Sequence, residues 1–436
     1  MNRNEFHCKM EKIALYNYRC FTKLEVQFSA KINLLIGDNA SGKTTMIRAS
    51  SAVLNSFFSG FSDENTRFIG LSKDDFRISE SETGLSNEEP IKINFEMFHK
   101  TASLQLHSKK GRTLQKPLNK IFNEGNTRYK KLFAGSKQVQ ALPLFASFST
   151  SDIHSVRKLN RDRFKKYEHK PSFGYYECLQ GDGFLDYWTL RLLVLREANT
   201  GELEIQGVLN AITAALGADG CNLIQDIHIR PIQGKIYYYL NDGRVTDTDN
   251  LSDGLRRLIN IVMDIGFRCM LLNKGFYGEK ACAKTSGTVL IDEIDLHLHP
   301  SLQSSVIKGL QRAFPKLQFI ITTHAPMVMT GVPISSDNKI IKLSYDRDNG
   351  YTAREVETYG LDASTIIQAI LGVPPRSKEV DERLESLFGL IDDDQYDLAV
   401  DRLKELRQTF GEHLPELANA EAMLNFLTEE DDDSDQ

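Results

Sequence analysis

The stretch GDNASGKTT at residues 37–45 combines glycines, a lysine and hydroxyl side chains in a spacing that binds phosphate groups. Gly37 and Gly42 let backbone N–H groups close around phosphate oxygens, and a helix that follows directs its positive end toward them. Lys43 would then reach the β and γ phosphates, and the Thr44 hydroxyl would bind Mg²⁺. The stretch therefore predicts an ATP and Mg²⁺ site, with nucleotide contacts from Gly37, Asn39, Ser41, Gly42, Lys43, Thr44 and Thr45.

The run VLIDE at 289–293 is an apolar strand pattern that ends in two carboxylates. The carboxyl end of such a strand opens into the ligand crevice of an α/β sheet. Asp292 is expected to order the magnesium there, and Glu293 to polarise the water that attacks the γ phosphate. Alone, this pattern fits a surface edge equally well, but beside a phosphate loop it indicates an active site.

Three histidines accompany these motifs. His324 ends the run QFIITTH, where it can hydrogen-bond the γ phosphate or the attacking water. We therefore expect Glu293, His324 and Lys43 to be the catalytic residues. His297 and His299 lie close together in sequence, but no further metal ligand is near, so a subunit contact or a structural role is favoured over zinc.

The segment LSDGL at 251–255 predicts a second helix that begins at an anion-binding end. Ser252 is a natural N-cap, and Gly254 allows close approach of another backbone. Alone, the segment fits an ordinary capped helix. One γ phosphate does not need two such helix ends from one chain, so the second end is expected to serve the nucleotide of another subunit.

Alternating strand and helix patterns surround these motifs and predict a layered α/β sheet. An alternating hairpin pattern opens the chain, INLLIG precedes the phosphate loop, and an apolar-faced helix follows it. From about residue 60 to 135 the sequence is more polar, which predicts an edge sheet with insertions. Beyond Tyr359 apolar residues recur every three or four positions and predict a helical appendage.

Charge is unevenly spread over the chain, although its net value is only −6. Residues 100–137 and 157–170 are strongly basic, and the chain ends in EEDDDSDQ. The basic stretches predict contact with DNA, RNA or an acidic protein surface, although charge runs are usually solvated faces. Among the lysines and arginines of the first stretch are Lys109, Lys110, Arg112, Lys116, Lys120, Arg128, Lys130 and Lys131.

Composition is that of an ordinary globular protein, with 41% apolar and 26% charged residues in a chain of 436. Its six cysteines form no C-x-x-C pair, which favours reduced structural thiols. No run of about eighteen apolar residues occurs, and the first residues lack a signal-peptide pattern. We expect a cytoplasmic protein without membrane contact.

Taken together, the motifs resemble those of ABC-type ATPases of the RecF, Rad50 and SMC group. The phosphate loop, LSDGL signature, VLIDE strand, DLHLHP segment at 295–300 and His324 occur in family order. The resemblance implies that two subunits sandwich two ATP molecules, with Ser252 and Gly254 contacting the partner's nucleotide. It also implies an adenine-side contact at Arg19, although a polar turn explains that residue equally well.

This family resemblance covers roughly residues 11–345 and implies an ABC-type ATPase head at 1–345 with an insertion at about 60–140. A C-terminal helical domain at 346–428, suited to partner or subunit docking, and an acidic disordered tail at 429–436 would follow. No glutamine fills the family's Q-loop, and Asp75 is the expected substitute on the magnesium side. Asp253 stands where transporters have glycine, which is expected to slow turnover.

Within this group the chain most resembles the PtuA ATPases of Septu, including those that accompany retrons. The similarity includes LPLFASFST, the HLHP segment and the C-terminal run from YGLDAS to AML. It implies an anti-phage function and a separate HNH-type nuclease partner. Two other functions stay open, namely a RecF-like repair ATPase and a nucleotide sensor with negligible turnover. Long coiled-coil arms are excluded, because only about two hundred residues separate the phosphate loop from the signature.

Overall fold

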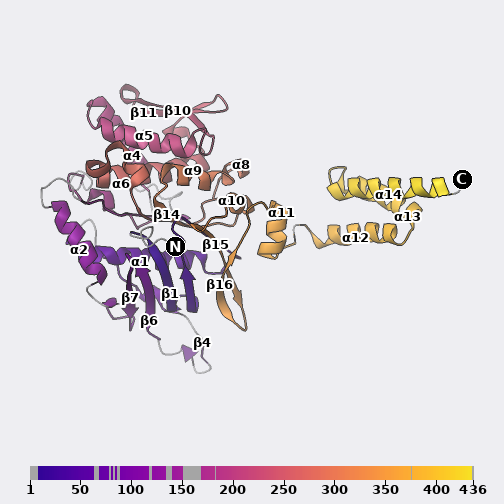
Figure 1. The fold of residues 1–436 in the computed structure, drawn as a ribbon, viewed down its shortest axis with the longest axis horizontal. Coiled ribbons are helices and arrows are strands. Elements are labelled where there is room, and N and C mark those ends of the chain that lie inside the picture. Colours follow the sequence, from indigo (N-terminus) through magenta and orange to yellow (C-terminus); the bar gives the residue numbers. More distant parts are fainter. Residues whose placement is uncertain are drawn as a thin grey trace. The chain divides into compact units, whose positions relative to one another are not determined.

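The computed structural model describes two compact units, Met1–Ala363 and Ser364–Gln436. Strands and helices alternate in the first unit, whereas the second consists of helices (Figure 1). None of the described helices is both long and apolar enough to cross a membrane. The described residues are 8–62, 68–77, 80–81, 84–85, 89–116, 120–133, 140–150, 168–181, 183–374 and 376–434.

A six-stranded sheet forms the centre of the first unit. All of its neighbouring pairs are parallel except the last hairpin. Three of its four inner strands are mostly apolar and fully buried, because helices or a second sheet cover both faces. The strand order is β16 (Gly350–Val356), β15 (Asn338–Asp346), β3 (Ile32–Ile36), β14 (Leu317–Thr322), β13 (Gly287–Ile291) and β9 (Leu144–Phe148).

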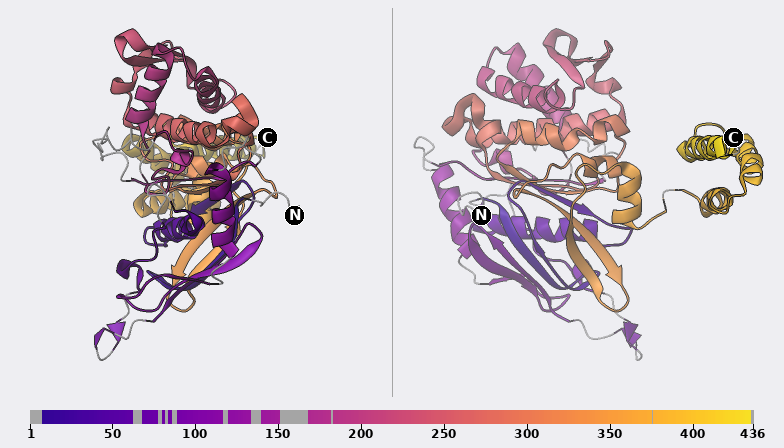
Figure 2. Two further views of the ribbon diagram at one scale, coloured as in Figure 1. Left: turned by 90° about the vertical axis from the view of Figure 1, so that its left-hand side faces the viewer. Right: turned by 45° about the vertical axis from the view of Figure 1, so that its right-hand side comes forward.

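A second, antiparallel sheet of five strands lies below the first in Figure 1 and in both views of Figure 2. The alternation in IKINFEM buries Ile91, Ile93, Phe95 and Met97 on one face, as the two-residue period of a strand requires. The order is β2 (Phe21–Gln27), β1 (Met10–Tyr18), β6 (Ile91–Met97), β7 (Lys100–Leu106) and β8 (Leu114–Lys116), and a short hairpin pairs β4 (Glu80–Ser81) with β5 (Gly84–Leu85).

The predicted insertion at about 60–140 is therefore an integral part of the fold. β6, β7 and β8 complete the five-stranded sheet through the pairing of β6 with β1. The helix α2 (Lys120–Phe133) packs against the end of the helix after the phosphate loop, where Gly125 approaches the backbone of Phe57 closely. The polar composition of this segment predicts an edge sheet with insertions. That composition arises because these strands carry exposed polar side chains, such as Lys92, Thr101 and Lys116.

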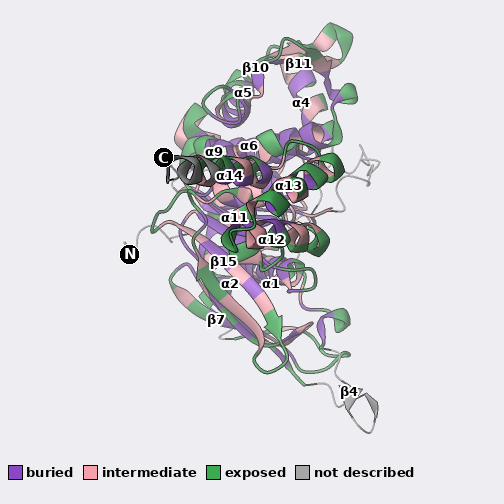
Figure 3. Ribbon diagram, turned by 90° about the vertical axis from the view of Figure 1, so that its right-hand side faces the viewer, coloured by how far each residue is buried: buried purple, intermediate pink, exposed green. Residues whose placement is uncertain are grey.

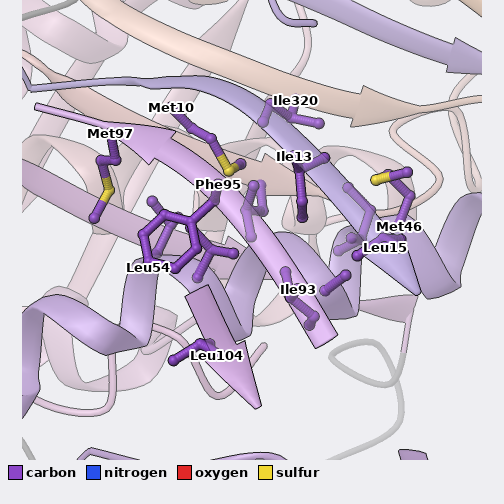
Figure 4. Close-up of a cluster of buried hydrophobic side chains, with 14 of the residues drawn as sticks. Met10, Ile13, Leu15, Met46, Leu54, Ile93, Phe95, Met97, Leu104 and Ile320 are labelled. Atoms are coloured by element: carbon purple, nitrogen blue, oxygen red, sulfur yellow. The ribbon is translucent and has the colours of Figure 1, made fainter. Parts of the chain in front are cut away.

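The helix α1 (Lys43–Asn55) lies between the two sheets and contacts strands of both. Met46 and Leu54 on α1 join Ile13 and Phe95 of the five-stranded sheet and Ile320 of the six-stranded sheet in one core cluster (Figure 4). All five side chains are almost completely buried. Because these contacts hold α1 on both sides, they fix the start of the helix, where the phosphate loop ends.

A helical layer covers the opposite face of the six-stranded sheet (Figure 1). The Trp188 indole donates to Asp264 over 2.6 Å and stacks on Phe267, which ties two of these helices together. The layer comprises α4 (Leu185–Glu197), α5 (Glu202–Leu216), α6 (Asp253–Tyr277) and α9 (Val306–Ala313), with the shorter α7 (Ala281–Lys284), α8 (Pro300–Gln303) and α10 (Pro326–Thr330), and a small sheet of β10 (Ile224–Arg230), β11 (Lys235–Leu240) and β12 (Val245–Asp247).

The second unit is a bundle with its own apolar core. Leu387, Leu406 and Leu417 are fully buried, and other faces of its helices are exposed (Figure 3). Arg407 donates to both carboxylate oxygens of Glu421. Its helices are α12 (Lys378–Asp392), α13 (Tyr396–Phe410) and α14 (Pro415–Ser434), after α11 (Ala363–Thr365) and the π-helical turn Ile366–Leu371.

The α/β fold and the C-terminal helical region predicted from the sequence are confirmed, but their boundary lies later than residue 345. β16 pairs with β15 and belongs to the six-stranded sheet, so the first unit runs to Ala363. Of these two strands, only β16 falls wholly within the predicted helical region at 346–428, because the motif-bearing sequence ends before it. α14 continues to Ser434, into the 429–436 segment for which a disordered tail was expected.

Candidate functional site

Three neighbouring parallel strands bring the predicted motifs to one edge of the central sheet. β3 ends at the phosphate loop, β13 ends at Ile291 directly before Asp292, and β14 between them leads to His324. The register pairs Ile291 with Ile321 and Leu34 with Ile321, so the three carboxyl ends lie level with one another. Motifs separated by more than two hundred residues in sequence therefore form one candidate nucleotide site.

The phosphate loop has the backbone conformation that its glycines allow. Gly37 and Gly42 have φ angles of 141° and 93°, and Ala40 also has a positive φ of 64°. A side chain at Gly37 would approach the Leu343 carbonyl oxygen to 2.2 Å, and one at Gly42 would approach the Phe21 ring to 2.4 Å. Both positions thus require glycine for conformation and for space.

The Lys43 side chain lies inside the loop that it follows. Its ammonium donates to the carbonyl oxygens of Gly37 and Asp38, each over 2.8 Å, and only 6% of the residue is exposed. Burial lowers the pKa of Lys43 from its ordinary value of 10.5, and the charges of Asp38, Glu293 and Asp292 oppose this shift. A buried cation among carbonyl oxygens is suited to an anionic ligand that brings further negative charge.

Of the other loop residues predicted to bind nucleotide, Ser41 is buried, and its backbone N–H donates to the Asp38 carbonyl. Asn39 and Thr44 are exposed, and Thr45 is partly buried. The Thr44 hydroxyl lies 3.4 Å from Oδ1 of Asp292, the residue predicted to order the metal. A hydroxyl beside a carboxylate is an oxygen donor set of the kind that Mg²⁺ prefers, so these two residues fit the predicted cation.

Thr322 bonds both of the acidic residues that follow β13, one through its side chain and the other through its backbone. Its hydroxyl donates to Oδ1 of Asp292 over 2.6 Å and accepts from the backbone N–H of Glu293 over 2.7 Å. Glu293 has a φ of 50°, in the left-handed region that non-glycine residues rarely adopt. Thr322 therefore holds the turn that directs the Glu293 side chain away from the strand, a role that its sequence pattern did not reveal.

Replacing Thr322 by valine should disturb catalysis more than nucleotide binding. Valine keeps the shape but leaves the buried Glu293 N–H without its acceptor, which costs about 1–3 kcal/mol of unfolding free energy. We expect turnover to fall roughly tenfold or more, because the turn of Glu293 loosens, while the Kd for ATP changes little. Thr288→Val, on the same strand as Asp292, removes a buried hydroxyl bond to Gln318 and is the matched control. Equal turnover losses in both variants would contradict this role.

The segment after Glu293 also contacts the end of β14. The Thr323 hydroxyl donates to Asp295 over 2.6 Å, and Ile294 N–H donates to the Thr322 carbonyl. His324 follows directly and is exposed, at the same sheet edge as Glu293. His297 and His299 are exposed too, and among the described residues no cluster of metal-binding side chains occurs.

The signature residues face a different part of the surface. Ser252 is the exposed N-cap residue of α6, and a side chain at Gly254 would approach the His297 carbonyl to 2.2 Å. Both residues border a concavity of about 1170 Å³, together with His297 and His299. No residue of the phosphate loop at 37–45 is among its lining residues.

Arg19 and Asp75, which the sequence assigned to adenine and magnesium, bind each other. Arg19 donates through Nε to Asp75 Oδ1 over 2.8 Å, and the second oxygen of Asp75 caps the turn at Ser72. Asp75 as a whole is 8% exposed, and its carboxylate already has these donors, so the structure gives no support to its predicted magnesium role. The turn that contains Arg19 does lie beside the phosphate loop, through the contact of Phe21 with Gly42.

A strand, loop and helix suited to phosphate, beside a strand that ends in paired carboxylates, define a P-loop nucleotide-binding protein of the α/β class. Residues 32–330 match the model of a family described as "AAA domain, putative AbiEii toxin, Type IV TA system", and the chain belongs to this family.

Two named relatives are similar to most of the chain. The Retron Vc95 probable ATPase of Vibrio cholerae serotype O1 biovar El Tor is 23% identical over 465 residues, which cover 94% of this chain and 88% of the relative. The Septu protein PtuA of Bacillus thuringiensis is 23% identical over 406 residues, or 89% of this chain and 86% of PtuA. The chain is thus an ABC-type ATPase homologue related to PtuA.

Among solved structures, the Smc head bound to the C-winged helix domain of ScpA aligns with 80% of this chain and 98% of its own. The sequence identity is 14%, and the TM-score is 0.44.

Proposed function

We propose that this chain hydrolyses ATP between two copies of itself, and that the ATP-bound dimer controls a separate nuclease. The division of the site supports this proposal most directly. Lys43 and Glu293 meet at one sheet edge, whereas Ser252 borders a concavity that residues 37–45 do not line. This separation suits a signature that contacts the γ phosphate of a second subunit.

Each composite site would divide the work between subunits. Lys43 and the N–H groups of the loop would hold the phosphates of one subunit's ATP, and Ser252 with Gly254 of the other would close over the γ phosphate. Glu293 would accept a proton from the attacking water, while His324 would orient that water or the phosphate. Magnesium, which Thr44 and Asp292 would hold, would neutralise charge on the phosphate oxygens.

Concentration dependence of phosphate release tests this arrangement. If two copies form each site, the turnover per chain should rise with protein concentration until the dimer is saturated. A turnover that is independent of concentration would contradict the sandwich. ATP binding without phosphate release would instead support the nucleotide sensor, for which the exposed carboxylate of Asp253 beside Ser252 is the favouring observation.

The defence function of the named relatives suggests the purpose of the ATP cycle. An ATP-dependent closed dimer and an open dimer are two states that a docked nuclease can distinguish, so nucleotide can control cleavage. The second unit is suited to such docking, because Met423 and Phe426, three residues apart on α14, are 42% and 61% exposed. Large exposed apolar side chains are frequent anchors of protein interfaces.

Charging this exposed pair should separate docking from hydrolysis. With Met423→Asp and Phe426→Asp together, we expect the affinity for the nuclease to fall roughly tenfold or more, because two apolar contacts are lost. ATP turnover should stay within about twofold, since both residues lie in the second compact unit. Glu405→Ala, at an exposed position of α13, is the control. The measurement is co-purification of nuclease activity that depends on ATP, and full retention would contradict this docking site.

Nucleic-acid contact remains a proposal for part of the first basic stretch. Arg128 is 2% exposed and donates to Glu124, which removes it from the predicted surface. Lys109, Lys110 and Lys130 are exposed. If they bind phosphates, DNA or RNA affinity should fall steeply with salt, and replacing them together with Lys131 by alanine should flatten that dependence. In the second stretch, residues 157–167 lie outside the described residues.

A further inference from the structure

Arg257 connects the signature helix to the backbone of Asp292 and Glu293 in its own subunit. It lies on α6 five residues after Ser252, and only 4% of it is exposed. Its guanidinium donates through one nitrogen to the Glu293 carbonyl oxygen and through the other to the Asp292 carbonyl oxygen, each over 2.5 Å. Such a planar fork fixes two acceptors relative to each other, which a lysine ammonium cannot do.

These two carbonyls flank a residue whose backbone lies in the left-handed region. Glu293 has the positive φ of 50°, and its N–H donates to Thr322. The peptide groups around Glu293 are thus held from β14 by Thr322 and from α6 by Arg257. A shift of either support would change where the Glu293 carboxylate points, because backbone in this region keeps its conformation only under such constraint.

α6 touches the same segment at a second point. The contact of Gly254 with the His297 carbonyl leaves no room for a side chain, so the first turn of α6 packs directly against the backbone of His297 and Leu298. The exposed end of that turn is Ser252. The helix end that would meet another subunit's phosphate therefore lies only five residues, about one and a half helical turns, before Arg257, which contacts Glu293.

We infer that Arg257 positions Glu293 for a basal rate of hydrolysis and transmits to it the displacement of the signature helix, so that the nucleotide of a sister subunit raises hydrolysis in this one above that basal rate. This inference rests on the proposed ATP sandwich. Arg257 touches no substrate and acts through the peptide groups beside Glu293. It makes the two composite sites of a dimer interdependent.

Mixed dimers of two variants show in which subunit Arg257 acts on hydrolysis. A dimer of one Lys43→Ala subunit and one Ser252→Arg subunit contains one intact composite site. The Ser252→Arg subunit supplies the phosphate loop and Glu293 of that site, and the Lys43→Ala subunit supplies the signature. Adding Arg257→Ala to the subunit with the working Glu293 should lower turnover at least roughly tenfold. Adding it to the subunit with the working signature should leave turnover within about twofold. If Arg257 only stabilised the signature helix, the second arm would lose activity, and that result would overturn the inference.

ATP binding and turnover of the Arg257→Ala homodimer provide a second test. Arg257→Ala should keep the Kd for ATP, lower turnover and reduce the Hill coefficient toward one, with partial recovery in Arg257→Lys. Arg256→Ala is the matched control, because Arg256 is on the same turn but donates to the Thr248 carbonyl instead. Unchanged turnover in the Arg257→Ala homodimer would overturn the inference even if the mixed dimers were inactive. If the mixture of Lys43→Ala and Ser252→Arg subunits, with Arg257 unchanged in both, regains no turnover, that result would instead count against the ATP sandwich itself.

Discussion

Replacing Glu293 by glutamine should leave ATP bound and nearly stop its hydrolysis. Glutamine keeps the size of the side chain and the backbone contacts with Thr322 and Arg257, but it cannot accept the proton of the attacking water. Loss of a general base costs about 10²–10⁴-fold in rate, so phosphate release should fall by at least two orders of magnitude. The reaction is followed by single-turnover release of phosphate from ATP.

The same substitution should strengthen ATP-dependent dimerisation, since the closed state is no longer removed by hydrolysis and one negative charge near the γ phosphate is lost. Mass measured in solution with and without ATP reports this effect. Glu279→Gln changes an exposed glutamate in the same unit and should alter neither quantity. A Glu293→Gln protein that hydrolyses ATP at the unmodified rate would remove Glu293 from the mechanism.

Replacing Lys43 by alanine should abolish nucleotide binding at working ATP concentrations. The buried ammonium would otherwise pair with the β and γ phosphates, and loss of one partner of a buried charge pair costs about 2–5 kcal/mol. This corresponds to a rise in Kd of roughly thirtyfold to more than a thousandfold. Titration of the protein with a fluorescent, non-hydrolysable ATP analogue measures the change.

Folding should survive the Lys43→Ala substitution. Burial lowers the pKa of Lys43, which shows that the protein environment disfavours its charge, so removing that charge should cost little unfolding free energy. Thermal unfolding without nucleotide should therefore match the unmodified chain, whereas stabilisation by ATP should be lost. Lys23→Ala, at an exposed position of β2, is the control. Unaltered ATP binding in the Lys43→Ala variant would contradict the assignment of the phosphate loop.

Much of the fold and of the site could be predicted, because local patterns in the sequence determine the strands and helices that form them. The apolar runs before Gly37 and Asp292 are buried strands of one sheet, and their carboxyl ends must meet at the same edge. The helix after the loop follows from the spacing of Met46, Ile47 and Val53, which are buried. These features depend on period and order along the chain, both of which a single sequence displays.

Contacts between distant segments could not be predicted in the same way. Thr322 and Arg257 are ordinary residues in an apolar strand and a helix, and only the register of β14 and the packing of α6 bring them to Glu293. The pairing of Asp75 with Arg19 could not be predicted either, because the two residues are 56 positions apart in the sequence. The role of β16 was missed because strand pairing, unlike the pattern of one strand, is not local.

Two copies of this chain should share each ATP, and the ATP turnover of a mixture of two inactive variants tests this arrangement most directly. Lys43→Ala lacks the loop contact, and Ser252→Arg should block the signature with a bulky side chain, so neither homodimer should release phosphate. In an equimolar mixture, half of the dimers at random pairing contain one intact composite site, and we predict that ATP turnover returns. If the mixture stays as inactive as its components while each variant remains folded, then no chain contributes its signature to the ATP of another chain. That result would contradict a shared ATP site.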